Sequence, residues 1–311
     1  MIVRALMGAA RCGRWLLIAG LLVGIALPGL ARAMAPAIVP MIAVMLCLAA
    51  LREGPAAALP RRGTWGRSFL VTVTLQAVLP LAVGLFLLTL GWLNTPLAIG
   101  AVLAMAAAPI TGSPGLAVMS GADATVSLRL LTLGTALLPL TSAPVFATLP
   151  LFPDPGAVAA AACRLLLVVG AAACVAASLR RVFPALTAPA SRPALDGAMA
   201  VAMAVVVVGL MSEIAPALFG TPGLLALTFA CAFALYFVQT LLAWAAARRA
   251  LPTGEAGAVV IAAGNRNLAL FLAAVPSDAA APLMLFVGCY QVPMYLTPFF
   301  LRRVCPHPDR N

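Results

Sequence analysis

The chain has 311 residues, of which 64% are hydrophobic and only 9% are charged, and its mean hydropathy is +1.12. This composition excludes a soluble globular domain and predicts an integral membrane protein built from helices, because the apolar runs are long rather than short and alternating. The formal net charge of +11 does not indicate nucleic-acid binding, since the chain contains no lysine and most arginines stand at the ends of apolar runs.

Ten apolar runs are long enough to cross a bilayer, which takes about 17 to 25 helical residues. The expected spans are 14–30, 34–51, 67–91, 96–120, 124–149, 160–179, 197–213, 222–247, 256–276 and 282–301. Fifteen arginines fall at the two termini and in alternate loops, whereas only Arg32 and Arg164 fall in the opposite loops. The positive-inside rule therefore predicts a multi-pass protein of the cell (inner) membrane with both termini in the cytoplasm.

The first expected span has an alternative interpretation as a signal peptide. Arginines precede an apolar stretch, Trp15–Leu30, and Ala31–Ala33 resembles an A-x-A cleavage site. Cleavage would leave an odd number of spans and remove the symmetry described next, so we favour a retained helix.

An internal repeat relates the two halves of the chain. The stretch Pro293–Pro298 lies 154 residues after Pro139–Pro144, and each carries a proline at both ends. The same offset lays Ala108–Ser113 over Ala262–Asn267, so a polar, Gly-containing interruption occupies the same place in each half. With five spans apiece, residues 1–151 and 152–311 are expected to insert as inverted repeats, and paired broken spans point to a transporter's binding site.

The two interruptions supply the main candidate binding residues. Broken helices leave backbone groups unpaired at mid-membrane, which is tolerated where they line a cavity. We expect Thr111 and Ser113 from one break, and Asn265, Arg266 and Asn267 from the other, to bind substrate or ion. A second interpretation of Arg266 is a bridge between helices through backbone carbonyls.

Weaker candidates lie on neighbouring spans, where Thr132 and Gln291 are expected to face the crossing, although bonds between helices would also explain them. All eight acidic residues fall in loops or at span ends, and the single histidine, His307, is in the tail. No metal cluster, paired acid and base or cofactor motif is apparent, so we predict neither an enzyme nor a metal site.

Three stretches resemble the bile acid:sodium symporter family: residues 107–144, residues 261–274 and the Tyr290–Gln291 region. The resemblance implies a panel domain (first, second, sixth and seventh spans) and a core domain (third to fifth and eighth to tenth). It implies that the fourth and ninth spans are unwound and cross, as in sodium-proton antiporters. Substrate would bind between the domains, with Asn267 nearby.

The departures from that family concern sodium. Relatives that use sodium carry a carboxylate and a Gln where this chain has Ala262 (or Ala263) and Arg266, and their Ser-Asn pair falls on Pro114–Gly115. The resemblance thus implies that the Arg266 guanidinium takes the place of the cation, and no cofactor is expected.

The leading hypothesis is a carrier of a small or amphipathic organic anion that works by alternating access without ordinary sodium coupling. Its alternatives are an ordinary sodium symporter, an auxin-efflux-carrier-like permease and a non-transporting receptor. An arsenite permease is disfavoured, because the thiol it needs is missing near Ala107.

Overall fold

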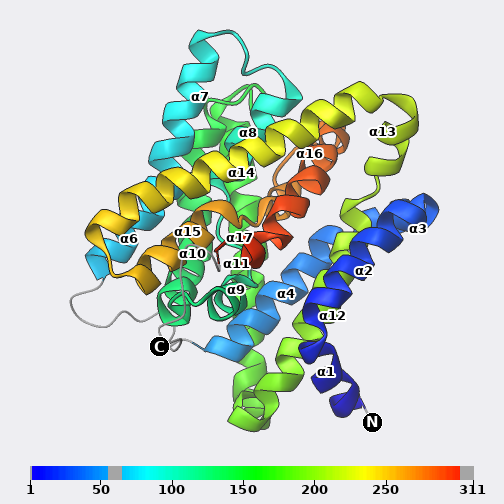
Figure 1. Cartoon of the computed structure of the whole chain (residues 1–311), viewed down its shortest axis with the longest axis vertical. Coiled ribbons are helices and arrows are strands. Elements are labelled where there is room, and N and C mark those ends of the chain that lie inside the picture. The colour runs from blue at the N-terminus through cyan, green and yellow to red at the C-terminus, as the bar shows by residue number, and fades with distance from the viewer. Residues whose placement is uncertain (1, 55–64, 302–311) are drawn as a thin grey trace.

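The computed structural model describes residues 2–54 and 65–301, and every regular element within them is helical (Figure 1). The expected all-α class is therefore confirmed. Five of the counted arginines (61, 62, 302, 303 and 310), Cys305 and His307 lie outside the described residues. The first half contains α1 (Ile2–Arg11), α2 (Gly13–Ala26), α3 (Pro28–Met34), η1 (Ala35–Ala37), α4 (Ile38–Glu53), α6 (Trp65–Val73), the π-helical turn η2 (Thr74–Val78), α7 (Leu79–Thr89), α8 (Pro96–Ala106), α9 (Ser113–Ser120) and α10 (Ala124–Phe146).

The second half begins with a long helix, α11. Its elements are α11 (Pro155–Val182), η3 (Pro184–Thr187), η4 (Pro189–Ser191), α12 (Arg192–Leu210), α13 (Ile214–Gly220), α14 (Pro222–Ala250), α15 (Thr253–Gly264), η5 (Leu268–Ala273), α16 (Ser277–Tyr295) and α17 (Thr297–Leu301).

Seven helical segments among the described residues are long and apolar enough to cross a membrane, or eight if a bent pair counts as one span. They are Pro28–Glu53, Trp65–Thr89, Ala124–Phe146, Pro155–Val182, Arg192–Gly220, Pro222–Ala250 and Ala279–Leu301. Their length and composition establish a multi-pass membrane protein.

Three of the ten expected spans, the first, fourth and ninth, are not among these seven. The first, 14–30, covers α2 and the start of α3, and the preceding helix α1 meets α2 at an angle of 88°. The fourth is interrupted between α8 and α9, and the ninth between α15 and η5, so each contributes only one short apolar α-helix of its own, Pro96–Ala106 or Thr253–Gly264. Polar and Gly or Pro residues concentrate at both interruptions, which explains why the helices stop there.

Several helices begin at side chains that cap their free N–H groups. The Asp123 carboxylate accepts from the N–H groups of Thr125 and Val126 at 2.7 and 3.0 Å at the start of α10. Asp154 caps α11 in the same way through the Ala157 N–H at 2.9 Å. Two of the eight acidic residues are thereby used as helix caps.

Contacts between elements fall into two sets. Helices α1, α2, α4, α11 and α12 contact one another, with α12 packed against α1, α2 and α4. Helices α6 to α10 and α14 to α17 form the other set, in which α14 packs on α15 and α16. Figure 1 shows α1, α2 and α12 on the lower right and α6 and α15 on the left, while α14 runs diagonally from the left toward α13 at the upper right. The sets meet where α10 contacts α11 and where η5 contacts α4 and α11.

Two glycines one turn apart allow α2 to pack closely against α12. A Cβ on Gly20 would lie 2.8 Å from the Ala204 carbonyl oxygen, and one on Gly24 would lie 2.7 Å from Met211 Cβ. Such G-x-x-x-G faces let membrane helices approach at backbone distance. Gly24→Leu is therefore expected to force α2 away from α12 and lower the free energy of unfolding by about 1–3 kcal/mol.

Thermal unfolding of the purified protein in detergent measures this effect. The matched control is Gly29→Leu on α3, because a Cβ there meets no atom within 4 Å. Equal melting temperatures for the two variants would show that the glycine face does not set this packing.

Candidate functional site: a crossing of two broken helices beside a cavity

The two interrupted helices meet at their breaks. The Ile110 N–H donates to the Asn265 carbonyl at 2.8 Å, and the Asn267 N–H donates to the Ala108 carbonyl at 2.7 Å. These bonds flank an isolated antiparallel pair formed by Pro109 and Arg266. Each break leaves backbone N–H and C=O groups unpaired within its own helix, and these groups form hydrogen bonds with the other break. Burial in an apolar bundle requires such pairing.

Arg266 joins three separate segments at this crossing. Its guanidinium donates from Nε to the Ala263 carbonyl at 2.9 Å, from Nη1 to the Ala107 carbonyl at 2.8 Å and from Nη2 to the Leu75 carbonyl at 3.2 Å. These carbonyls belong to the end of α15, the end of α8 and the π-helical turn η2. The residue is only 1% exposed. The contacts match the bridging interpretation of this arginine.

Gly264 lets the end of α15 lie directly against α14. A Cβ at this position would stand 2.9 Å from the ring of Tyr236, so a larger residue would separate the helices. The Gly264 carbonyl accepts from the Tyr290 hydroxyl at 2.8 Å, and Gln239 Nε2 donates to the same hydroxyl at 3.3 Å. The break is therefore held by side chains from two neighbouring helices.

Asn265 is fixed by a second set of polar contacts. Its Nδ2 donates to the Ile261 carbonyl at 3.2 Å, and its Oδ1 accepts from the Thr297 hydroxyl at 2.9 Å. The Tyr236 hydroxyl lies 2.6 Å from Thr297 Oγ1. Sequence reasoning missed Tyr236 and Thr297; the signal available for Thr297 was its place beside the second proline of the repeated motif.

A cavity of about 750 Å³ lies between the two sets of helices and reaches the first break. One wall comes from α1, α2, α4 and α12, and the other from the 110–112 break, α9 and the ends of α16 and α17. Five methionines line it: Met45, Met119, Met199, Met203 and Met294. Methionine side chains adapt to varied apolar shapes, so this lining suits a bulky apolar group.

A second, small pocket of about 20 Å³, called the extension below, adjoins this cavity on the side of the second break and shares Ile110, Thr111 and Tyr295 with it. Thr111 lines both spaces, whereas Asn267 and Gln291 line the extension. Thr111 and Gln291 are each 5% exposed, and Thr111 Oγ1 and Gln291 Oε1 find no hydrogen-bond partner within the described protein. Buried polar atoms normally have partners, so these two are free to bind a ligand group, Thr111 Oγ1 as donor or acceptor and Gln291 Oε1 as acceptor only.

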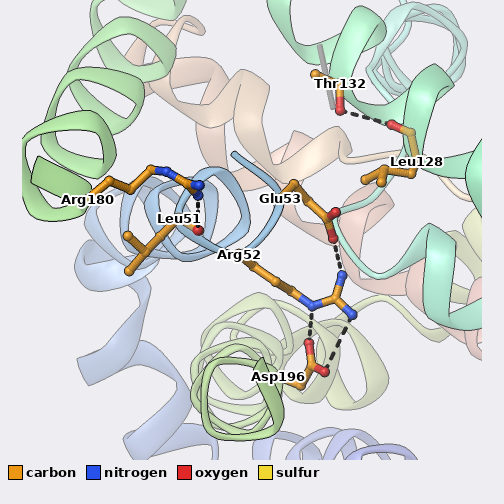
Figure 2. Close-up of polar contacts among 7 residues, drawn as sticks. All are labelled: Leu51, Arg52, Glu53, Leu128, Thr132, Arg180 and Asp196. Atoms are coloured by element: carbon orange, nitrogen blue, oxygen red, sulfur yellow. Dashed lines mark hydrogen bonds and ion pairs between the residues drawn. The ribbon is translucent and has the colours of Figure 1, made fainter. Parts of the chain in front are cut away.

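The structure brings together some predicted site residues and not others. Thr111, Asn267 and Gln291 converge on the narrow extension, and Asn265 lines the larger cavity although its side chain is already bonded. Ser113 is fully buried and, like Arg266, is not among the residues that line these two spaces. The Thr132 hydroxyl donates to the Leu128 carbonyl of its own helix at 2.9 Å (Figure 2).

Charged residues that sequence reasoning assigned only to loops and span ends stand at the far end of the cavity. Arg52, at the end of α4, forms ion pairs with Glu53 and with Asp196 of α12, and all three line the cavity (Figure 2). Arg180 of α11 donates to the Leu51 carbonyl nearby. This end of the cavity, called the mouth below, therefore carries two carboxylates and one paired guanidinium. The polar groups at the opposite, inner end beside Thr111 are neutral.

The fold and this site define a class, a multi-pass helical membrane protein with a buried crossing of two broken helices beside a cavity. Compared with models of known protein families and with curated proteins, the chain matches none. The geometry of the site is therefore the guide to function.

Proposed function

We propose that the chain is a secondary carrier of a small or amphipathic organic anion and works by alternating access. One observation carries this proposal: paired helix breaks stand beside a cavity that separates two sets of helices. Carriers bind substrate at such discontinuous helices and expose the site by moving one set of helices against the other.

The proposed architecture has ten crossings in two inverted repeats, 1–151 and 152–311. The broken pairs α1 with α2, α8 with α9, and α15 with η5 supply three crossings beyond the seven long helices. The set that contains α1, α2, α4, α11 and α12 corresponds to the panel, and the other set to the core. We place the protein in the cell membrane with both termini in the cytoplasm, because the arginines favour that orientation.

The inner end of the cavity favours a carboxylate or sulfonate head group. Thr111, Asn267 and Gln291 bring a hydroxyl and two amides to one small space, and all three side chains can donate to an anion. Gly112, Pro114 and Gly115 place the N-terminal end of α9 on the cavity wall, and that end of a helix carries partial positive charge. The methionine-lined part accommodates the apolar body of the substrate.

A thermal-shift screen of the purified protein tests this assignment. Each amphipathic carboxylate is paired with its methyl ester, which keeps the apolar body and removes the charge. At least one acid is expected to stabilise the protein more than its ester does, by roughly 2.7 kcal/mol at 100 times the dissociation constant. Stabilisation by esters and acids alike, or by neither, would count against an anion carrier.

Transport of the same carboxylates and methyl esters is then measured in proteoliposomes. The stabilising acid is expected to enter saturably with or without a sodium gradient. Strict dependence on sodium would favour an ordinary symporter instead. Binding without transport, in vesicles that hold correctly folded protein, would favour a receptor.

A further inference from the structure

The three carbonyl oxygens around Arg266 have the character of a cation site. They come from three separate segments and converge on one guanidinium at 2.8 to 3.2 Å. Two belong to the C-terminal ends of α15 and α8, and helix C-termini carry partial negative charge. Backbone carbonyls at unwound membrane helices and half-helix ends are the ligands that bind alkali cations in carriers and channels.

The arginine has no carboxylate partner in the described part of the chain. The ion pairs found there join Arg52 to Glu53 and Asp196, and Arg67 to Glu255. The positive charge of Arg266 is therefore balanced by carbonyl dipoles. Because the guanidinium is covalently attached to the chain, it cannot dissociate during a transport cycle, as a coupling ion must.

We infer that Arg266 is a tethered cation that permanently fills a three-carbonyl cation site at the crossing. Sodium does not fit this site while the guanidinium occupies it. Resting on the proposed carrier function, the inference adds that substrate movement draws on no alkali-cation gradient at this site. If the Arg266 side chain is removed, the three carbonyls are expected to bind a free guanidinium or alkali cation.

Chemical rescue separates this role from simple packing. Arg266→Ala removes the guanidinium and leaves room for a free cation, whereas Arg266→Met removes the charge but keeps the space filled. Melting temperatures are compared in guanidinium, sodium, potassium and choline chloride at equal millimolar concentrations. Guanidinium or an alkali cation is expected to raise the melting temperature of Arg266→Ala by about 3 °C or more over choline.

The methionine variant and the wild-type protein are expected to respond to these salts no more than to choline. Arg266→Lys, which keeps a positive charge, is expected to be similarly insensitive. Rescue of the alanine variant alone supports the tethered cation. Equal responses of the alanine and methionine variants would overturn it.

The wild-type protein keeps the inference testable even if Arg266→Ala does not fold. A sodium-specific or potassium-specific rise in its melting temperature would contradict a site filled by Arg266. These melting temperatures are measured without an organic substrate. Their interpretation is therefore the same whether or not the protein is an anion carrier. Failure of the carrier proposal and failure of the tethered cation are therefore distinguishable.

Discussion

Arg266→Met is expected to lower the free energy of unfolding by about 3 kcal/mol or more. The substitution relieves the burial of a charge, worth about 2.5–3.5 kcal/mol on insertion scales. It also leaves three buried carbonyls without donors, at about 1–3 kcal/mol each, and two helix ends without a cation. The second effect is larger, because the three carbonyls together lose about 3–9 kcal/mol.

Thermal unfolding in detergent measures the loss, which corresponds to a fall of roughly 6 °C or more in melting temperature. Arg164→Met is the matched control, since Arg164 is exposed on α11 and its replacement should change stability by no more than about 0.5 kcal/mol. A methionine variant that melts with the wild type would show that the carbonyls do not need the guanidinium.

Thr111→Val combined with Gln291→Leu is expected to weaken anion binding by roughly 100-fold. Each side chain would donate one hydrogen bond to a charged head group, worth about 1.5–3 kcal/mol, and 1.4 kcal/mol corresponds to a factor of ten. Stability is expected to stay constant or rise, because both residues hold buried polar atoms without partners. Loss of binding with unchanged folding is the signature of a functional pair.

Thr132→Val is the control for this pair. Its hydroxyl donates only within α10, to the Leu128 carbonyl, so binding should be unaffected. Dissociation constants for the stabilising acid, measured by titration of the melting temperature, compare the three proteins. A double variant that binds as tightly as Thr132→Val would remove Thr111 and Gln291 from the site.

The helical membrane class follows directly from the sequence, because apolar runs of bilayer length leave few other folds. The location of both interruptions was also readable, since Gly264 and Arg266 in one apolar run, and Pro109 and Gly112 in another, are unfavourable in a continuous helix. In the structure these two interruptions lie against each other. Local chemistry was thus sufficient to locate the two breaks, whereas their crossing was expected from the family resemblance.

The partners of Arg266 could not be read from the sequence. They are backbone carbonyls, which every residue carries, and one belongs to a π-helical turn at Leu75 that no residue type announces. Thr132 shows a different limit of the sequence. A polar residue on a core helix can bond within its own helix, as the Thr132 hydroxyl does, so its binding role stays a prediction.

The cavity also depends on long-range packing. Met45, Met119 and Met203 come from three helices and have no common sequence pattern. Arg52 and Asp196, which are 144 residues apart, meet at its mouth. Only the packing of the two sets of helices brings these residues together.

Alternating access requires the two sets of helices to move relative to each other across the cavity. Val118 of α9 and Ala200 of α12 line it from opposite sides. Replaced by cysteines in a background without other cysteines, they allow spin labels to report the distance across the cavity. A control pair within one set joins Ala200→Cys to the native, exposed Cys174 of α11.

Double electron-electron resonance on these pairs in lipid nanodiscs tests alternating access most directly. The 118–200 pair is expected to show at least two distance populations whose proportions change when the stabilising acid is added, while the 174–200 pair keeps one. A single, unchanged 118–200 distance with and without that acid would contradict a carrier that works by alternating access.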